Sequence, residues 1–321
     1  MPAQTKFELK PGPATREAFG RALVELGRVN KDVVVCDADL SKSTMTVYFQ
    51  KEFPDRFFSF GIAEANMVGA GCGLALAGKI PFVSSFSAFV INKGFEQLRA
   101  CAAYPNVNVK VVGTHSGISI GEDGPSQMSI EEIGLACSLP NFVVMAPADE
   151  ASTKALVHAA AAHVGPVFIR TGRPKSPIIY GPEQKFEIGR SIEVVSGKDV
   201  TVIANGLLVA QAILAAEALE AEGVSVRVID MHTVKPLDRD AVARAAAETG
   251  AIVVAEEHLV DAGLGVRVAQ AVAETGPCPM EFVGIQETYA ESGQPDELLD
   301  KYGLLARDVA AAVRKVAGRK K

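Results

Sequence analysis

Long hydrophobic runs are missing from this sequence. No stretch reaches the ~18 uninterrupted apolar residues that a membrane-spanning helix needs. The N-terminal stretch MPAQTKFELKPGPATREAF also lacks the apolar core of a secretory signal peptide. We therefore expect a soluble, cytoplasmic protein with no membrane partner.

Basic patches and cysteine pairs are also scarce. Binding to nucleic-acid phosphates needs a basic surface, whereas this chain has a formal net charge of −6 at pH 7. We therefore expect no nucleic-acid partner. No Cys-x-x-Cys pair occurs, and the odd number of widely spaced cysteines favours reduced core residues over a disulfide framework. These cysteines are Cys36, Cys72, Cys101, Cys137 and Cys278.

What the sequence does contain is a regular alternation of two kinds of segment. Short β-branched runs alternate with Ala-rich amphipathic stretches along the 321 residues, which is the pattern of parallel βαβ units. The segment RTGRPKSPIIYGPEQKFEIGR interrupts this alternation with three prolines, as a linker does. The sequence therefore predicts an α/β protein with two successive three-layer domains and mostly parallel sheets, at residues 1–185 and 186–321.

The alternation also predicts individual elements. The strands expected in the first domain are Asp32–Cys36, Ile80–Ser84, Val107–Val112, Phe142–Met145 and Val167–Arg170. Its expected helices lie near Thr15–Leu26, Glu64–Ala77, Asn92–Tyr104, Ile130–Ser138 and Asp149–His163. The second domain is expected to have strands at Asp199–Ala204, Val224–Asp230, Ala251–Ala255 and Met280–Gly284. Its expected helices lie near Leu208–Glu222, Asp238–Thr249, Leu264–Glu274 and Asp308–Val316.

A single carboxylate, Glu64, heads the uncharged segment ANMVGAGCGLALAG. A helix that is apolar on every side is expected to be buried on every side, and a buried carboxylate must be partnered or neutralised. Glu64 could simply complement the helix dipole. However, Gly69, Gly71 and Gly73 weaken a helix, which suggests that something packs closely against its backbone. The sequence therefore raises the question of which group is the partner of Glu64.

The loop GISIGEDGPSQMSIEE (Gly117–Glu132) is rich in glycine but acidic, which is not the composition of a P-loop phosphate cradle. Taken alone, it predicts a pair of tight turns before a helix. Loops that follow strands build the sites of α/β folds, so Asp123 and Gln127 are candidate polar groups there. Arg16 and Arg173 are candidate anion-binding residues, although isolated arginines are usually solvated or salt-bridged.

Two further features are weaker. His158 and His163 lie five residues apart on an expected helix and point to different faces, so we do not expect them to share a metal. The AEEH run, which includes Glu256, Glu257 and His258, is expected at the protein surface or at a domain interface.

Four segments, taken together and in this order, resemble the transketolases, which are thiamine-diphosphate enzymes that move two-carbon ketol groups between sugar phosphates. The segments are FGIAEANMVGAGCGLALAGKIPF, SSFSAFV, THSGISIGEDGPSQMSIEE and IRTGRPKSPIIY. The resemblance continues through VRVIDMHTVKPLD and VVAEEHLVDAGLG. It implies a pyrimidine-binding domain at residues 1–185 and a transketolase C-terminal domain at residues 186–321.

The resemblance implies a role for each cofactor-binding residue. Glu64 matches the catalytic glutamate that hydrogen-bonds N1′ of the aminopyrimidine and favours the tautomer that deprotonates thiazolium C2. The implied partner of Glu64 is therefore thiamine diphosphate. Phe86 and Phe89 match the aromatic wall beside the pyrimidine, and Asp39 matches an aspartate near the thiazolium.

The resemblance also implies a substrate site. The residues that match those gripping the sugar phosphate are Arg16, Ser43, His115 and Arg173, of which the arginines suit a dianion. Asp123 matches an acid that bonds a substrate hydroxyl. Gln127 stands where many members have histidine, which shifts proton transfer towards His115 or the cofactor.

Half of the family pattern is missing. Full-length transketolases are about twice this size, and their N-terminal half carries a Gly-Asp-Gly motif that holds Mg²⁺ and the diphosphate. No Gly-Asp-Gly occurs here. The resemblance therefore implies the C-terminal subunit of a split transketolase, with no metal ligands of its own. It also implies a separate diphosphate-binding subunit and an α₂β₂ assembly.

Three alternatives remain open at this point. Two share the architecture, namely 1-deoxyxylulose-phosphate synthase and the β subunits of 2-oxo-acid dehydrogenases, but the loop GEDGPSQ with Arg16 and Arg173 favours transketolase. The third is a non-catalytic scaffold subunit, which would have no use for the full set of candidate residues.

Overall fold

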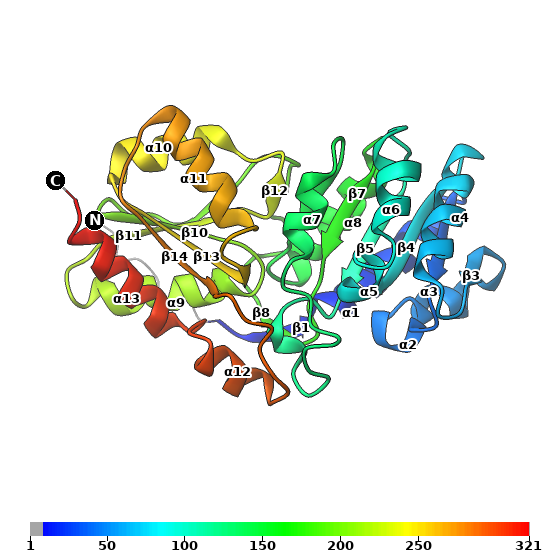
Figure 1. Cartoon of the computed structure of the whole chain (residues 1–321), viewed down its shortest axis with the longest axis horizontal. Helices are drawn as coiled ribbons and strands as arrows, with labels where there is room; N and C mark the ends of the chain where they lie inside the picture. Colours follow the sequence, from blue (N-terminus) through cyan, green and yellow to red (C-terminus); the bar gives the residue numbers. More distant parts are fainter. Residues whose placement is uncertain (1–8, 321) are drawn as a thin grey trace.

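The computed structural model describes residues 9–320, which form two α/β halves lying side by side (Figure 1). One half is built on a seven-stranded sheet and the other on a five-stranded sheet. Most strand pairs are parallel, and helices cover both faces of the sheets because a parallel sheet has no face suited to water. The predicted α/β class is confirmed.

The seven-stranded sheet has the order β12-β6-β7-β5-β4-β2-β3. Six of its strands are parallel, and β12 joins antiparallel to β6. The strands are β2 (Val33–Asp37), β3 (Phe57–Ser59), β4 (Ile80–Phe86), β5 (Lys110–Thr114), β6 (Val143–Met145), β7 (Val167–Arg170) and β12 (Thr233–Lys235). Because β12 comes from the second half of the sequence, the two halves share a strand.

The five-stranded sheet has the order β14-β13-β10-β11-β9, with β9 antiparallel to β11. Its strands are β9 (Ile192–Val195), β10 (Val200–Ala204), β11 (Val226–Asp230), β13 (Ile252–Leu259) and β14 (Met280–Ile285). A separate antiparallel pair, β1 (Pro11–Ala14) and β8 (Lys175–Pro177), ties the start of the described chain to the proline-rich connection.

Helix positions follow local sequence signals. Asp149 caps α8 by accepting the Ser152 N–H at 2.9 Å, and Gly250, with a φ of 65°, ends α10. The helices are α1 (Thr15–Val29), α2 (Ser41–Thr44), α3 (Val47–Glu52), α4 (Glu64–Leu76), α5 (Ser87–Val90), α6 (Phe95–Gln97), α7 (Glu132–Ser138), α8 (Glu150–Ala162), α9 (Leu208–Glu220), α10 (Arg239–Thr249), α11 (Leu264–Thr275), α12 (Pro295–Lys301) and α13 (Ala306–Ala317). Short 3₁₀ helices lie at Pro54–Arg56 and Ile118–Ile120, and a π-helix lies at Leu98–Ala103.

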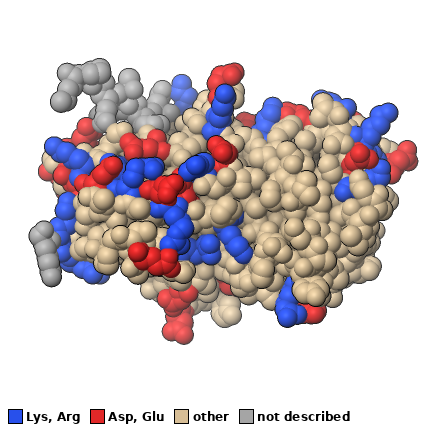
Figure 2. All heavy atoms as spheres, turned by 90° about the horizontal axis from the view of Figure 1, so that it is seen from above, with Lys and Arg blue, Asp and Glu red and all other residues tan. Residues whose placement is uncertain are grey.

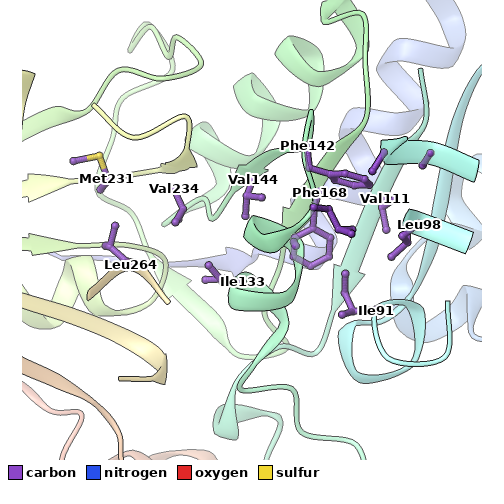
Figure 3. Close-up of a cluster of buried hydrophobic side chains, with 14 of the residues drawn as sticks. Ile91, Leu98, Val111, Ile133, Phe142, Val144, Phe168, Met231, Val234 and Leu264 are labelled. Carbon is purple, nitrogen blue, oxygen red and sulfur yellow. The ribbon is translucent and has the colours of Figure 1, made fainter. Parts of the chain in front are cut away.

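The hydrophobic core runs from one half into the other. One cluster joins Phe142 and Phe168 in the first half to Met231 and Leu264 in the second (Figure 3). A second cluster joins Ile118, Ile120, Met128 and Ile130 of the 117–131 loop to the five-stranded sheet and its helices. The two halves are therefore packed together through apolar side chains as well as through β12.

Every strand and helix predicted from the sequence has a counterpart, in most cases with shifted ends. The largest departure is the helix expected at Asn92–Tyr104, which starts at Phe95 and becomes a π-helix at Leu98. Helix α4 is also not buried on every side as expected, because Asn66, Gly73 and Leu76 are exposed. No helix within residues 9–320 is both long and apolar enough to cross a membrane.

Candidate functional site

The candidate residues gather at one edge of the seven-stranded sheet. Glu64 begins the helix that follows β3, Phe86 ends β4, and His115 follows β5. These strands are parallel, so their carboxyl ends lie at the same edge. The chain passes from β3 on one side of β2 to β4 on the other side, and such a switch point is where open α/β sheets bind ligands.

Glu64 has a protein partner that sequence reasoning missed. The side chain of Glu64 is 3% exposed, and the half-exposed Lys93 places its Nζ 3.3 Å from Glu64 Oε2. The same Nζ lies 4.6 Å from the centre of the Phe89 ring, a cation–π contact. The helix expected to contain Lys93 starts only at Phe95, so a turn directs this lysine towards Glu64.

Three stacked aromatic rings lie next to this carboxylate. The Phe86 and Phe89 rings stack with 5.6 Å between their centres and 15° between their planes. The imidazole of His115 stacks on Phe86 at 3.8 Å. A planar ligand that hydrogen-bonds to Glu64 would meet an aromatic surface here.

His115 is held neutral in a fixed tautomer. Burial, with the nearby Arg16 and Arg173 guanidinium groups, lowers its pKa to about 3. Arg16 Nη1 lies 3.0 Å from His115 Nε2, and an arginine can only donate, so Nε2 is an acceptor. The proton is then on Nδ1, which donates to Thr114 Oγ1 at 2.8 Å. His115 Nε2 is therefore equipped to accept a hydrogen bond at neutral pH.

Arg16 and Ser43 come together beside His115. Arg16 Nη1 donates to the Ser43 carbonyl oxygen at 2.8 Å, which leaves the Ser43 hydroxyl free of that contact. Arg16 Nε is buried without a hydrogen-bond partner among the described residues. The predicted grouping of Arg16, Ser43 and His115 is thus present.

Arg173 is engaged by the loop that precedes α7. It donates to the Ile120 carbonyl oxygen and to Glu122 Oε2, the latter at 2.8 Å, and lies 3.9 Å from Asp123 Oδ2. Asp123 is 39% exposed and Gln127 is half-buried. Arg173 and Asp123 are therefore close neighbours, as a shared substrate site requires.

Asp39 is exposed in the turn after β2, where its φ is 65°. The neighbouring Asp37, which sequence reasoning missed, is buried and holds this turn. Its Oδ1 accepts the Leu40 N–H at 2.7 Å, and its Oδ2 accepts the hydroxyls of Thr44 at 2.7 Å and Thr46 at 2.9 Å. Burial raises the pKa of Asp37, and these hydrogen bonds oppose the rise.

Other sequence interpretations need correction. Close packing against a glycine of α4 occurs at Gly71, where an added Cβ would lie 2.5 Å from Val83, whereas Gly69 and Gly73 have open space. The five cysteines are free thiols, but Cys101, Cys137 and Cys278 are only half-buried, which is not the core position predicted for them.

Of the two alternatives for AEEH, a surface and a domain interface, the structure supports the interface, because the run is buried and Glu257 and His258 contact Ser119 and Gly134 of the first half. His158 faces Glu25 from α8, whereas His163 follows that helix. No group of three or more His, Cys, Asp or Glu side chains within residues 9–320 could hold a metal ion.

Comparisons with known proteins agree with this geometry. The family model for the transketolase pyrimidine-binding domain matches residues 11–178, and that for the transketolase C-terminal domain matches residues 189–309. A curated relative, the 6-deoxy-6-sulfo-D-fructose transketolase subunit SqwH of Clostridium sp. (strain MSTE9), is 38% identical and is covered over 95% of each chain.

Human transketolase is 38% identical over 98% of this chain but only 51% of its own length, so this chain spans about half of that relative. A solved structure described as "Split gene transketolase, inactive beta4 tetramer" is 48% identical, with a TM-score of 0.89 over 97% of this chain and 100% of that chain. Campylobacter jejuni transketolase shares the fold, with a TM-score of 0.81 at 23% identity.

Proposed function

The chain belongs to the transketolase family, and from this premise we propose that it supplies the pyrimidine end of a thiamine-diphosphate site. The observation that carries this proposal is the buried Glu64 carboxylate beside the stacked rings of Phe86 and Phe89. A carboxylate and an aromatic wall suit one nitrogen and one face of an aminopyrimidine.

Glu64 is positioned for proton transfer to or from such a ring. The Lys93 ammonium now interacts with both Glu64 and the Phe89 ring, so a pyrimidine that hydrogen-bonds to Glu64 must displace it. When bound, thiamine diphosphate supplies the nucleophilic carbon that carries the two-carbon unit. Glu64 then holds or shares a proton with the ring nitrogen that it faces, which is general acid–base assistance.

The proposed substrate is a sugar phosphate. Arg16 and Arg173 offer positive charge to a phosphate, and Ser43 and Asp123 offer groups to its hydroxyls. His115 Nε2 accepts a hydrogen bond from a substrate hydroxyl if Arg16 turns towards the phosphate. Neutralisation of Arg16 and Arg173 by the phosphate would also raise the pKa of His115, which burial and these two cations lower. Gln127 can donate or accept a hydrogen bond but cannot carry out acid–base catalysis. Asp39 is proposed to lie near the thiazolium.

A separate subunit is proposed to bind Mg²⁺ and the diphosphate. Two relatives of similar length support this division: SqwH, which is named a transketolase subunit, and the split-gene transketolase chain, which this chain matches over 95% and 100% of their lengths. The half with the seven-stranded sheet, at the right of Figure 2, also presents a broad face with few charged side chains, which suits a partner chain. We propose an α₂β₂ assembly and the domain division at residues 185 and 186.

The setting of this activity is also a proposal. Transfer of ketol groups between sugar phosphates belongs to the pentose phosphate pathway of carbohydrate metabolism. Free thiols are typical of the reducing cytoplasm, and the five cysteines of the chain are free.

Reconstitution tests the proposal. The chain is mixed with a subunit that carries the Gly-Asp-Gly motif, thiamine diphosphate and Mg²⁺, and ketol transfer from a ketopentose phosphate to an aldopentose phosphate is followed. We expect turnover in the mixture and none from either chain alone. Turnover by the lone chain at ordinary enzyme rates would exclude the split site. Release of CO₂ from pyruvate by the mixture would instead identify a synthase or dehydrogenase subunit.

A further inference from the structure

Two neighbouring glutamates lie in the second half of strand β13 and point to opposite sides of it. Glu256 and Glu257 are each 2% exposed, and successive side chains of a strand alternate between its faces. Glu256 accepts the N–H groups of Leu264 and Gly265, both at 2.7 Å, at the start of α11. Glu256 therefore serves the five-stranded half alone, whereas Glu257 faces the other half.

Glu257 binds the loop that carries the candidate substrate residues. Its Oε1 accepts the Ser119 N–H at 2.7 Å. A Cβ on Gly117 would lie 2.1 Å from the carboxylate carbon of Glu257, and Gly117 has a φ of 82°, so only glycine fits over this carboxylate. The Gly117 N–H donates to the Ser129 carbonyl oxygen at 2.7 Å, which closes the base of the loop.

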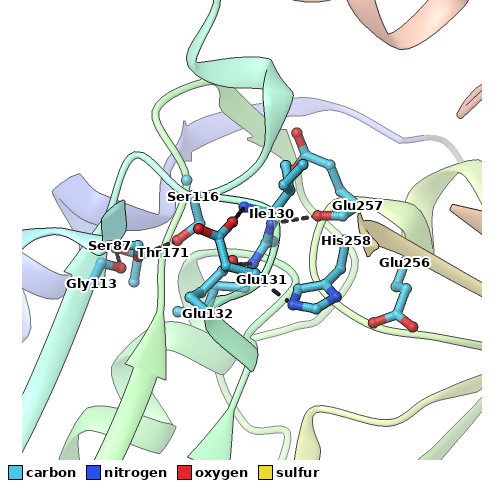
Figure 4. Close-up of polar contacts among 12 residues, drawn as sticks. Ser87, Gly113, Ser116, Ile130, Glu131, Glu132, Thr171, Glu256, Glu257 and His258 are labelled. Carbon is cyan, nitrogen blue, oxygen red and sulfur yellow. Dashed lines mark hydrogen bonds and ion pairs between the residues drawn. The ribbon is translucent and has the colours of Figure 1, made fainter. Parts of the chain in front are cut away.

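Arg170 links the same glutamate to the end of the loop. Its Nη2 donates to the Glu257 carbonyl oxygen at 2.7 Å, and its Nε donates to Glu132 Oε1 at 2.5 Å. Figure 4 labels the two acceptor residues, Glu132 and Glu257. Glu132 begins α7, directly after the loop, and its side chain is fully buried. Both ends of the loop are thus held by one buried network that crosses from one half to the other.

Apolar contacts fix the middle of the loop in the same way. Ile118, Ile120 and Met128 lie in the cluster that contains Leu298 and Leu299 of α12. The tip of the loop, between Ile120 and Met128, contains Glu122, Asp123 and Gln127. The first two of these interact with Arg173. The second half therefore shapes a loop whose tip contributes to the first half's site.

We propose that Glu257 is a positioning residue, through which the C-terminal half sets the geometry of the substrate-binding loop. The inference rests on the proposed function for its effect on catalysis, because the loop is predicted to bind the sugar phosphate through Asp123. Glu257 itself touches neither substrate nor cofactor. It acts on the loop through the Ser119 N–H, so the length of its side chain sets the loop geometry, whereas its charge pairs with Arg170 at 3.5 Å.

Two variants separate reach from charge. Glu257→Asp keeps the charge but is shorter by one methylene and loses the Ser119 contact. Glu257→Gln keeps the reach and an accepting oxygen but loses the charge. Glu256→Asp is the matched control, because Glu256 is equally buried, accepts backbone N–H groups at the same distance and does not touch the loop.

In the reconstituted enzyme, we expect Glu257→Asp to raise the KM for the sugar-phosphate donor roughly tenfold or more, with kcat changed less than the KM. The dissociation constant of thiamine diphosphate should stay unchanged, because Glu64 and the Phe86 wall lie outside the loop. Glu257→Gln should restore most of the affinity. Glu256→Asp should lower the melting temperature without raising this KM.

Amide hydrogen exchange provides a second readout that needs no activity. In the lone chain, Glu257→Asp should speed exchange at Ser119 and its loop neighbours, whereas Glu256→Asp should not. Unchanged exchange at Ser119 would overturn the inference even if the enzyme is active. Equal rises in KM for the two Asp variants would also overturn it. A wild-type complex without ketol transfer would overturn the proposed function alone, because the exchange comparison would still decide the role of Glu257.

Discussion

Two similarly buried glutamates, one in each half, have very different partners. Glu64 in the first half is 3% exposed, and its partner is the ammonium group of the half-exposed Lys93, at 3.3 Å. Glu257 in the second half is 2% exposed and is fixed by a backbone N–H at 2.7 Å and by Arg170. Each glutamate lies towards the carboxyl ends of the parallel strands of its own sheet.

This difference distinguishes a ligand-binding edge, that of Glu64, from a structural contact between the two halves, that of Glu257. At the first edge, an exchangeable cation can give way to a ligand that offers a better hydrogen bond. At the second edge, Asp230, Glu257 and His258 are enclosed between the halves, and exchange would leave a buried charge unpaired. A buried acidic residue is therefore a binding candidate when its partner is flexible and exposed.

Removing the acid of the site should have the largest effect. In the reconstituted enzyme, Glu64→Gln is expected to lower kcat about 10²–10⁴-fold, the range for loss of general acid–base assistance. The melting temperature of the lone chain should hardly change, because the amide keeps a similar shape. Stopped assays with saturating donor and acceptor measure this effect. A rate within twofold of wild type would favour the scaffold alternative.

Removing Arg170, the cation buried between the two halves, should instead lower the free energy of unfolding. Arg170→Met leaves Glu132 and Glu257 buried without their shared cation, and loss of one member of a buried ion pair typically costs about 3–5 kcal/mol. Denaturant unfolding of the lone chain measures this loss. Arg21→Met is the control, since Arg21 pairs with Glu150 in an exposed position, where such pairs contribute about 0–1 kcal/mol. Equal losses would contradict the distinction drawn here.

Stability should also respond to acid, because His232, between β11 and β12, is fully buried. Burial lowers the pKa of His232 to about 4, below its ordinary value of 6.5, so the folded state prefers the neutral ring. Its stabilising contribution is therefore complete above pH 6.5 and is lost as the pH falls towards 4, with a slope of about 1.4 kcal/mol per pH unit. Unfolding of wild type and His232→Gln between these pH values should show a shallower slope for the variant. Parallel curves would show that His232 does not contribute.

The smallest expected effect concerns Lys93, whose ammonium group competes with the ligand for Glu64. Lys93→Met should tighten thiamine-diphosphate binding in the assembled complex by up to about tenfold, since the ligand no longer displaces an ion pair. Lys79→Met, which removes an exposed pair with Asp32, is the control and should leave binding unchanged. Calorimetric titration measures both. Weaker binding in Lys93→Met would show that the lysine holds the ligand.

Local signals in the sequence predicted most of the fold. Parallel strands that are covered on both faces read as continuous apolar runs, so Val167–Arg170 was placed with its exact ends. The strand at Thr233–Lys235 was missed because it is short and pairs with residues almost 90 positions away. The π-helix at Leu98–Ala103 was also missed, because periodicity alone does not distinguish it from an α-helix.

The site was predicted less evenly. Glu64 stood out because no other charge lies near it in the sequence, and the family resemblance added the aromatic pair. Lys93 carried no such signal, since its contact with Glu64 depends on a turn whose geometry the sequence does not reveal. For the AEEH run, the sequence left a surface and a domain interface as alternatives, because three neighbouring polar side chains are seldom buried without partners, and a partner such as Arg170 cannot be identified from sequence spacing.

A calorimetric titration tests the central claim most directly. Thiamine diphosphate with Mg²⁺ is titrated into the chain alone, and then into the chain mixed with a diphosphate-binding subunit. The account predicts no measurable binding by the lone chain and saturable binding by the mixture, lost in Glu64→Ala. Tight binding by the lone chain would show that this chain also holds the diphosphate, and would contradict the account of a divided site.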